Sequence, residues 1–239
     1  MPNNQQMVFW KGNEGNLWAA YWSGSAWYKQ NLGYSTLNSP PAAVYQPSTG
    51  WVQVFWEGPG HTLYQAINNN GTWVGGWNLN VGSTVYSQPT AAVNGSQVGV
   101  FWKDSTGHLQ EAVWNGSAWV PFNLGSYFWN ISSAPSAFFK PSGENDVFWR
   151  DTAANLVEGV WNGSAWVGFG IPVGPIGSQP SANLEPSTGF QDVFWNANGN
   201  LKQAVWNGSS WVQFTIPGSL KLFRVLSSKE RICYFTASS

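Results

Sequence analysis

The chain has 239 residues, of which 43% are apolar, so it can bury the core of one large domain or of two small ones. Only 9% of the residues are charged and the net charge is -1, which argues against a surface for nucleic acid or for an anionic membrane. Cys233 is the single cysteine, so the sequence predicts neither an internal disulfide nor a cysteine metal site.

The N-terminal residues, MPNNQQMVFW, lack the basic region and the apolar run of a signal peptide, and no stretch reaches membrane-spanning length. We therefore expect a soluble chain without membrane insertion, which is either cytoplasmic or exported by a route that the sequence does not reveal. The sequence leaves the oligomeric state open.

A five-fold repeat organises the chain. The triplet Val-Phe-Trp ends at five tryptophans spaced 46, 46, 47 and 46 residues apart, namely Trp10, Trp56, Trp102, Trp149 and Trp195. A second tryptophan follows 16 or 17 residues later in each repeat, at Trp27, Trp73, Trp119, Trp166 and Trp211. Such a period is typical of a solenoid or a propeller. We place the repeats at about 6-39, 40-85, 86-131, 132-178 and 179-217 of a single domain, 1-239.

Each repeat is predicted to form four short strands. In the third repeat, the runs 98–102 and 109–114 flank a polar turn, and a third run covers 119–124. A fourth run follows a longer loop, as at 42–45 and 136–139. Helical periodicity of useful length is absent from the sequence. Four antiparallel strands in about 46 residues correspond to one propeller blade, so the sequence predicts an all-β, five-bladed β-propeller.

The hexapeptide WNGSAW at 114–119 returns at 161–166, with close variants at 206–211 and 22–27. Its Asn-Gly pair tolerates the positive φ angles of a tight hairpin. Six asparagines match the glycosylation pattern, and four of them fall in this hairpin or its variant; the six are Asn70, Asn94, Asn115, Asn130, Asn162 and Asn207. The fixed period favours a turn over a glycosylation site.

The two ends of the chain suggest how the ring closes. The first repeat begins at its Val-Phe-Trp strand and lacks the preceding strand of a full blade. Residues 231–235 align with 136–140, which form that strand in another repeat. We expect residues 218-239 to supply a closing strand and a tail, so that pairing of the N- and C-terminal strands removes two exposed sheet edges. The alternative is that 218-239 are a divergent end.

Repeats of the form VFWxDxxGxLxEAVWNGSAW, followed by a loop and SAPSA, resemble those of microbial β-propeller lectins of the Photorhabdus and Aleuria types over residues 7–217, and the five-fold count resembles the tachylectin type. The resemblance implies a sugar-binding propeller with shallow sites between or on neighbouring blades. Aleuria-type repeats hold the sugar with an arginine and a glutamate. Glu111 and Glu158 match that glutamate, but the arginine position carries Met7, Gln53, Gly99, Asp146 and Asp192. This departure argues against fucose recognition by the same mechanism.

Strand parity gives a separate prediction of which side chains share a face. If the first turn pairs Trp102 with Leu109, Trp102 and Glu111 lie on one face of the hairpin. Phe101 and Trp119 then lie on the other face, which is apolar. We expect the second tryptophan of each repeat to pack on that face between blades.

One polar position interrupts the first face in four repeats, whereas repeat one has Ala19 there. It either bonds to backbone groups of the next blade or accepts hydrogen bonds from sugar hydroxyls beside a flat tryptophan. The candidate carbohydrate-binding residues are therefore Trp56, Trp102, Trp149, Trp195, Gln65, Glu111, Glu158 and Gln203. Repeat one is expected to be weak or empty, which leaves at most four sugars per chain.

Enzyme chemistry is not predicted. A propeller glycosidase needs two unlike carboxylates at one place, whereas the acids here recur at equivalent blade positions, and the sequence contains no phosphate loop, HExxH or nucleophile elbow. The sequence predicts a lectin without catalytic residues, metal or cofactor, which binds cell-surface glycans through several weak sites with an avidity gain of about 10² to 10⁴. The alternative is a propeller scaffold for protein–protein interaction, and a glycoside hydrolase is less favoured.

Overall fold

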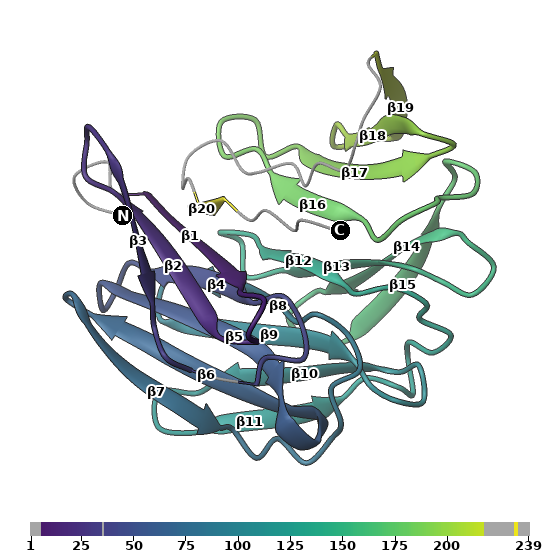
Figure 1. Cartoon of the computed structure of the whole chain (residues 1–239). Helices are drawn as coiled ribbons and strands as arrows, with labels where there is room; N and C mark the ends of the chain where they lie inside the picture. Colours follow the sequence, from purple (N-terminus) through teal and green to yellow (C-terminus); the bar gives the residue numbers. More distant parts are fainter. Residues whose placement is uncertain (1–5, 35, 218–231, 234–239) are drawn as a thin grey trace.

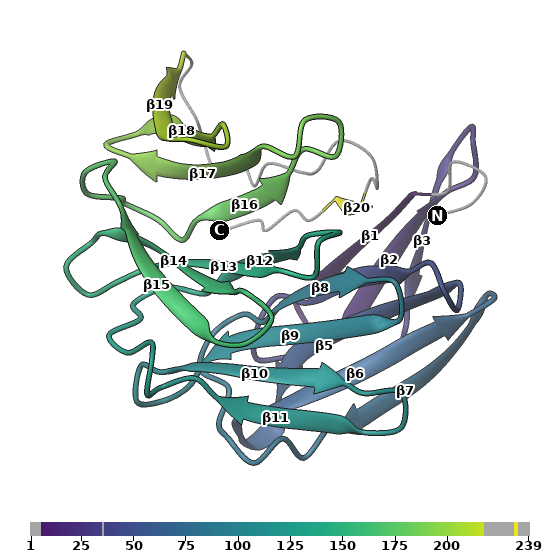
Figure 2. The same cartoon turned by 180° about the vertical axis from the view of Figure 1, so that it is seen from behind.

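The computed structural model describes residues 6–34, 36–217 and 232–233. Five β-sheets follow one another along the chain and are arranged like the blades of a propeller (Figure 1, Figure 2). The only helical element of the described part is the single turn η2 (Pro59–His61), so no helix there is long and apolar enough to cross a membrane.

We number the sheets as blades 1 to 5. Blade 1 contains β1 (Gln6–Lys11), β2 (Leu17–Trp22), β3 (Trp27–Asn31) and β20 (Ile232–Cys233). Blade 2 contains β4 (Ala42–Gln46), β5 (Trp51–Gly58), β6 (Thr62–Asn69) and β7 (Thr72–Asn78). Blade 3 contains β8 (Thr90–Asn94), β9 (Gln97–Lys103), β10 (Leu109–Trp114) and β11 (Trp119–Asn123). Blade 4 contains β12 (Ser136–Phe139), β13 (Asn145–Arg150), β14 (Leu156–Trp161) and β15 (Trp166–Ile171). Blade 5 contains β16 (Ser181–Leu184), β17 (Gln191–Ala197), β18 (Asn200–Trp206) and β19 (Trp211–Ile216).

In each of blades 2 to 5, four consecutive strands pair antiparallel, as predicted. Their first strands are neighbours in the order β4, β8, β12 and β16, and the last strand of each blade lies at the periphery (Figure 1). The prediction of an all-β, five-bladed propeller is therefore confirmed.

Blade 1 differs from the others in its first strand. β20 pairs with β1 in parallel, with Met7 opposite Ile232 and Val8 opposite Cys233. The alignment with 136–140 predicts an antiparallel strand, as β12 is to β13, so the predicted direction is wrong at these two residues. The long connection after β19 does not dictate the strand direction, whereas short turns fix it elsewhere. The rest of the predicted closing strand lies outside the described residues, and closure of the ring stays a prediction.

The repeated hexapeptide forms the hairpin between the second and third strands of a blade. Asn115 Oδ1 accepts hydrogen bonds from the N–H groups of Ser117 and Ala118 and from Ser117 Oγ. Gly116 has a φ of 101°, which favours glycine. The same side-chain bonds recur at Asn162 and Asn207. The predicted turn is confirmed.

An apolar layer fills each of the four junctions between consecutive blades. In each layer a phenylalanine of one blade meets the hairpin tryptophan of the next edge-on, with ring centroids 5.4 to 6.1 Å apart; the pairs are Phe9 with Trp73, Phe55 with Trp119, Phe101 with Trp166 and Phe148 with Trp211. We call the face of a blade that carries this phenylalanine its forward face and the opposite face its backward face. The prediction that the hairpin tryptophans pack between blades is confirmed for these four, whereas Trp27 is 46% exposed.

Candidate functional site

The predicted strand register, which pairs Trp102 with Leu109 and puts Trp102 and Glu111 on one face, is wrong by one residue. In blade 3, Trp102 pairs with Gln110 and Glu111 pairs with Phe101. Because directly opposite residues share a face, Glu111 lies on the forward face and Trp102 on the backward face. The same holds in the other blades, where the polar residue pairs with a phenylalanine: Gln65 with Phe55, Glu158 with Phe148 and Gln203 with Phe194.

The physical reason for the register lies in the turn between β9 and β10. Asp104 N–H donates to His108 O, and Asp104 Oδ1 accepts from the N–H groups of Thr106 and His108. The turn therefore closes between Asp104 and His108, and Lys103 rather than Trp102 lies opposite Leu109. A side-chain bond of this kind sets the register but leaves the alternating sequence pattern of the strands unchanged, so that pattern does not reveal which residues pair.

The four tryptophans predicted as sugar platforms are core residues in this structure. Trp56, Trp102, Trp149 and Trp195 are at most 2% exposed. Trp102 Nε1 donates to Thr84 O at 3.1 Å, and the ring of Trp56 stacks on that of Tyr64. A sugar that stacked on any of these rings would have to displace core side chains.

The polar position of blade 2 is part of a chain of hydrogen bonds that crosses the junction to blade 3. Gln65 Nε2 donates to Gln53 Oε1 at 2.6 Å, and Gln53 Nε2 donates to Gln46 Oε1 at 2.8 Å. Gln46 Nε2 in turn donates to Ser96 O of blade 3 at 2.7 Å. From the same blade, Trp119 Nε1 donates to Gln65 Oε1 at 3.3 Å. The Gln65 amide thus bonds mainly to side chains, not to the backbone groups considered from the sequence.

The junction between blades 3 and 4 contains a buried acid. Glu111 is 5% exposed, and Gly99 stands where blade 2 has Gln53. The ring of Phe139 fills the space that a side chain at Gly99 would need. Burial raises the pKa of Glu111 to about 8, so its carboxyl group is mostly protonated at pH 7 and can donate as well as accept a hydrogen bond.

The junction between blades 4 and 5 is ionic. Lys140 Nζ lies 3.0 Å from Asp146 Oδ2 and 3.4 Å from Glu144 Oε2. With its amide in the orientation that satisfies both neighbours, Gln191 donates to Glu158 Oε1 at 3.0 Å and accepts from Lys140 Nζ at 2.9 Å. Burial outweighs the attraction of Lys140 and raises the pKa of Asp146 to about 6 and that of Glu158 to about 8. Lys140 thus pairs directly with Asp146 and reaches Glu158 through the amide of Gln191.

Blades 5 and 1 show the remaining variants of the polar position. Gln203 Nε2 donates to Asp192 Oδ1 at 2.8 Å, and burial raises the pKa of Asp192. Blade 1 has the buried Ala19 instead, and Tyr21 OH accepts a hydrogen bond of 2.7 Å from Trp73 Nε1 of blade 2. The surroundings of this position therefore differ from blade to blade, although blades 2 and 5 share a glutamine and blades 3 and 4 a glutamate.

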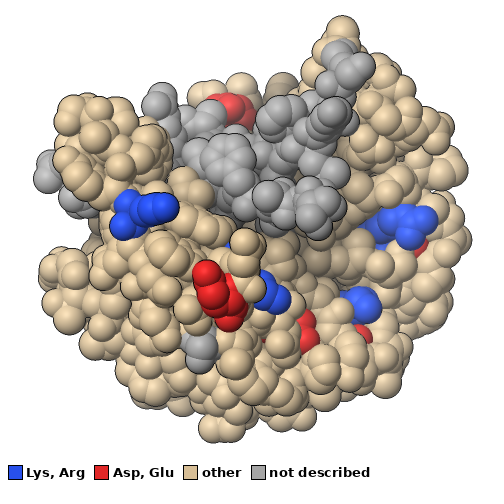
Figure 3. Space-filling model, viewed as in Figure 1, with Lys and Arg blue, Asp and Glu red and all other residues tan. Residues whose placement is uncertain are grey.

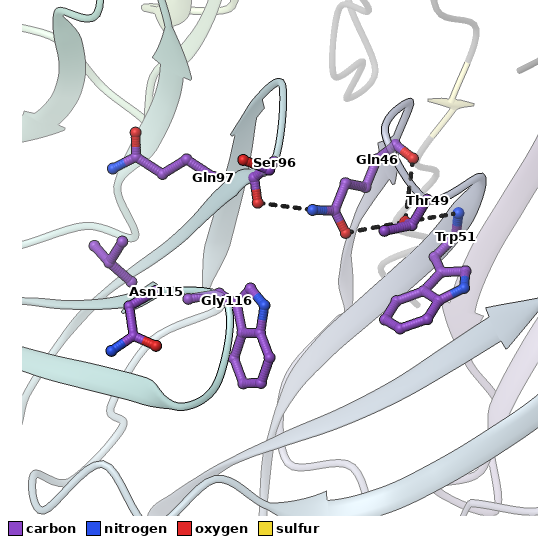
Figure 4. Close-up of a pocket in the computed structure, with 9 residues that line it drawn as sticks. Gln46, Thr49, Trp51, Ser96, Gln97, Asn115 and Gly116 are labelled. Atoms are coloured by element: carbon purple, nitrogen blue, oxygen red, sulfur yellow. Dashed lines mark hydrogen bonds between the residues drawn. The ribbon is translucent and has the colours of Figure 1, made fainter.

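A hollow of about 610 Å³ opens between blades 2 and 3 at the end where the hairpins turn. Its lining combines two half-buried tryptophans with amide and hydroxyl side chains: Gln46, Thr49, Trp51, Ser96, Gln97, Val113, Trp114, Asn115 and Gly116. Gln46 links its two sides, because its amide bonds to Ser96 O and its Oε1 accepts from Thr49 Oγ1, whose oxygen in turn accepts from Trp51 N–H (Figure 4). The hollow offers an aromatic surface beside several donors and acceptors.

Sequence reasoning missed this hollow. Trp51 stands five residues before the end of the Val-Phe-Trp strand, where the next three blades have Gln97, Glu144 and Phe190. A comparison of the turns between the first two strands of each repeat would have marked Trp51 as unusual. Among the described residues, no group of three or more His, Cys, Asp and Glu side chains could hold a metal ion.

The five successive sheets, four of them fully antiparallel, and the apolar junctions between them define a β-propeller. Its fold matches solved structures of fungal lectins. A structure reported as a fungal lectin with a six-bladed beta-propeller fold, from Aleuria aurantia, has a TM-score of 0.69 and 20% identity over 90% of this chain and 78% of that chain. A mutant of the same lectin in complex with Fucalpha1-6GlcNAc gives a TM-score of 0.72 at 20% identity over the same shares. AofleA from Arthrobotrys oligospora gives 0.70 at 15% identity over 90% and 72%.

A scan against protein-family models and a search of the curated proteins find no match. At these identities the structural matches establish a shared fold. The resemblance of the repeats to β-propeller lectins is confirmed at that level.

Proposed function

We propose that the protein is a carbohydrate-binding lectin. The observation that carries the proposal is the hollow between blades 2 and 3, where Trp51 and Trp114 lie beside the polar side chains of Gln46 and Asn115. A sugar ring has an apolar C–H face and a polar edge of hydroxyl groups, so it needs an aromatic surface beside donors and acceptors. The fold is shared with lectins whose structures hold a fucoside or Fucalpha1-6GlcNAc, which supports the same class of ligand.

The charge distribution favours a neutral glycan as the partner. The net charge is -1, and only 9% of the residues are charged. On the face shown in Figure 3, acidic and basic side chains are few and scattered between uncharged residues. A nucleic acid or an anionic membrane would need a concentrated basic surface.

We propose further that binding is multivalent. The polar residues Gln65, Glu111, Glu158 and Gln203 would contribute acceptors on the forward faces of blades 2 to 5, and the buried Trp56, Trp102, Trp149 and Trp195 would support the backward faces of the same blades. Each site would be weak, and several sites on one ring would raise the avidity for a glycan-bearing cell surface by about 10² to 10⁴. Repeat one would lack a site because Ala19 has no acceptor.

The burial of the two neighbouring acids Asp146 and Glu158 supports a function in binding rather than in catalysis. Asp146 is 0% and Glu158 is 6% exposed, and both face the neighbouring blade in the ionic junction. A glycosidase needs an acid and a nucleophile or base that reach the two sides of a bound glycosidic linkage. We propose that binding also needs no metal or cofactor.

We propose that the ring is closed by pairing of the chain ends. The support is that β20 already lies beside β1, the strand that lacks a first-strand partner from its own repeat. A closed ring would remove two sheet edges that could otherwise pair with other chains.

An immobilised-glycan array tests the proposed function. The lectin is expected to bind a set of neutral glycans, and Trp51→Ala together with Trp114→Ala is expected to weaken that binding. Trp129→Ala is a matched control, since Trp129 is 58% exposed and does not line the hollow. A protein that binds no glycan on the array, while its melting temperature shows that it is folded, would favour the scaffold alternative.

A further inference from the structure

Four blades expose an aromatic ring at the same register position of their outer strand. Each ring is 47 to 50% exposed and lies directly across the strand pair from the polar residue of its blade: Trp77 from Gln65, Phe122 from Glu111, Phe169 from Glu158 and Phe214 from Gln203. Since directly opposite residues share a face, every ring belongs to the forward face of its blade. The outer strands lie at the periphery of the propeller (Figure 1). The rings on these strands are therefore exposed at the outer edge of each forward face.

Blade 2 reaches this arrangement by a different local route. The pairing of β6 with β7 shifts register between Gln65 and Ala66, which places Trp77 rather than Gly76 opposite Gln65. The extra residue is Gly76, which has a φ of 78° and no partner in the register, and the neighbouring Gly75 has a φ of 138° and approaches the backbone of Ala66 so closely that a Cβ would collide with it. An insertion that would have removed the ring from its position is compensated by a bulge. This favours a role that depends on where the ring lies.

Blade 1 lacks both members of the pair. Ala19 replaces the polar residue, and the residue opposite it is Gln30 in place of an aromatic. In the five described blades, the exposed ring and the polar residue therefore occur together or not at all.

Single exposed aromatic rings are common on protein surfaces and need no explanation. Four rings at one position of a repeat are different, because half-exposed rings contribute little to the core and each lies opposite a polar residue in the strand pairing. A pyranose matches this pattern, since its C–H face stacks on the ring while its hydroxyl groups reach toward the polar residue. The low charge of the chain favours a neutral sugar over a charged ligand.

We propose that Trp77, Phe122, Phe169 and Phe214 are the stacking platforms of four equivalent subsites, each of which takes one neutral pyranose of a glycan. This inference rests on the proposed carbohydrate binding. It adds four sugar subsites at the rim of the propeller, where the outer strands lie, to the site proposed in the hollow between blades 2 and 3. It moves the aromatic partner of each polar residue from the buried Val-Phe-Trp tryptophan to the outer strand.

The test counts sugars and measures avidity in the full-length protein. The probes are methyl fucoside, soaked into crystals to count bound sugars, and immobilised Fucalpha1-6GlcNAc for avidity. Phe122→Ala, Phe169→Ala and Phe214→Ala are each expected to empty one rim subsite, and the triple variant to weaken binding to the surface by about 10²-fold or more. The control is Tyr127→Ala, because Tyr127 is 53% exposed but lies outside the outer strands.

A gain-of-function variant keeps the test decisive if a ring variant folds poorly. Ala19→Gln combined with Gln30→Phe installs the missing pair in blade 1 and is expected to add a fifth rim sugar. Glycan binding by the wild type together with full occupancy in the ring variants would overturn this inference and leave the lectin function intact. A wild type that binds neither probe nor any other glycan on the array would overturn the lectin function itself.

Discussion

Replacing Glu111 by glutamine should change how the stability of the protein depends on pH. Burial raises the pKa of Glu111 from 4.5 to about 8, so between these values the folded protein holds a proton that the unfolded chain releases. Stability is therefore highest below about pH 4.5 with respect to this group and falls as the pH rises towards 8. Each unit of difference in pKa corresponds to about 1.4 kcal/mol, which gives an upper limit of roughly 5 kcal/mol for the loss at pH 9.

The isosteric Glu111→Gln variant cannot ionise and should not suffer this loss. We expect similar free energies of unfolding for wild type and variant at pH 5, and a variant more stable by a few kcal/mol at pH 9, measured by urea denaturation. Glu158 titrates in the same range in both proteins, so the informative quantity is the difference between their free energies of unfolding at each pH. Glu14→Gln is the control, since Glu14 is exposed. Parallel curves for wild type and Glu111→Gln would refute the argument that Glu111 is buried without compensation.

Further predictions concern the ionic junction, the hairpins, the chain end and metal. Lys140→Met leaves the buried Asp146 without its cation, and we expect a loss of about 3 to 5 kcal/mol at pH 8. The loss should be smaller at pH 5, where Asp146 can take up a proton, and equal losses in denaturation would contradict this. Asn115→Ala removes the acceptor of three hydrogen bonds and should cost about 1 kcal/mol, seen as a lower melting temperature. Truncation after Pro217 should cause aggregation or earlier melting if the chain end closes the ring, and unchanged melting would argue against closure. Glycan binding should persist in a chelator, and its loss would point to a metal.

Most of the fold could be predicted from the sequence repeat. A Val-Phe-Trp triplet every 46 or 47 residues and an Asn-Gly hairpin fix where strands begin and turn, because both signals are local. The register between strands was not predictable in the same way. It depends on which residues close the turn, and the Asp104 side chain shifts that point by one residue.

The site was predicted less well because residue type does not determine burial. The tryptophans that end the Val-Phe-Trp strands have the right chemistry for a sugar platform, yet they pack in the junctions. The exposed rings were visible in the sequence at a constant place, three residues after the hairpin tryptophan, as in Phe122 and Phe169. In blade 2 the bulge moves the equivalent Trp77 by one position, which hides the pattern from a simple alignment.

The different polar groups in the junctions restrict how the blades can be ordered. The hairpins and the Phe–Trp contacts are so alike that, on apolar packing alone, any blade could follow any other. A shuffled chain would bring Lys140 and Glu158 of blade 4 to a junction without Gln191, the blade 5 side chain that bonds to both. Leaving such groups buried and unpaired costs about 1 to 5 kcal/mol each. The order of the blades is thus encoded between them, and a ring assembled from five copies of one repeat would have no means of telling its blades apart.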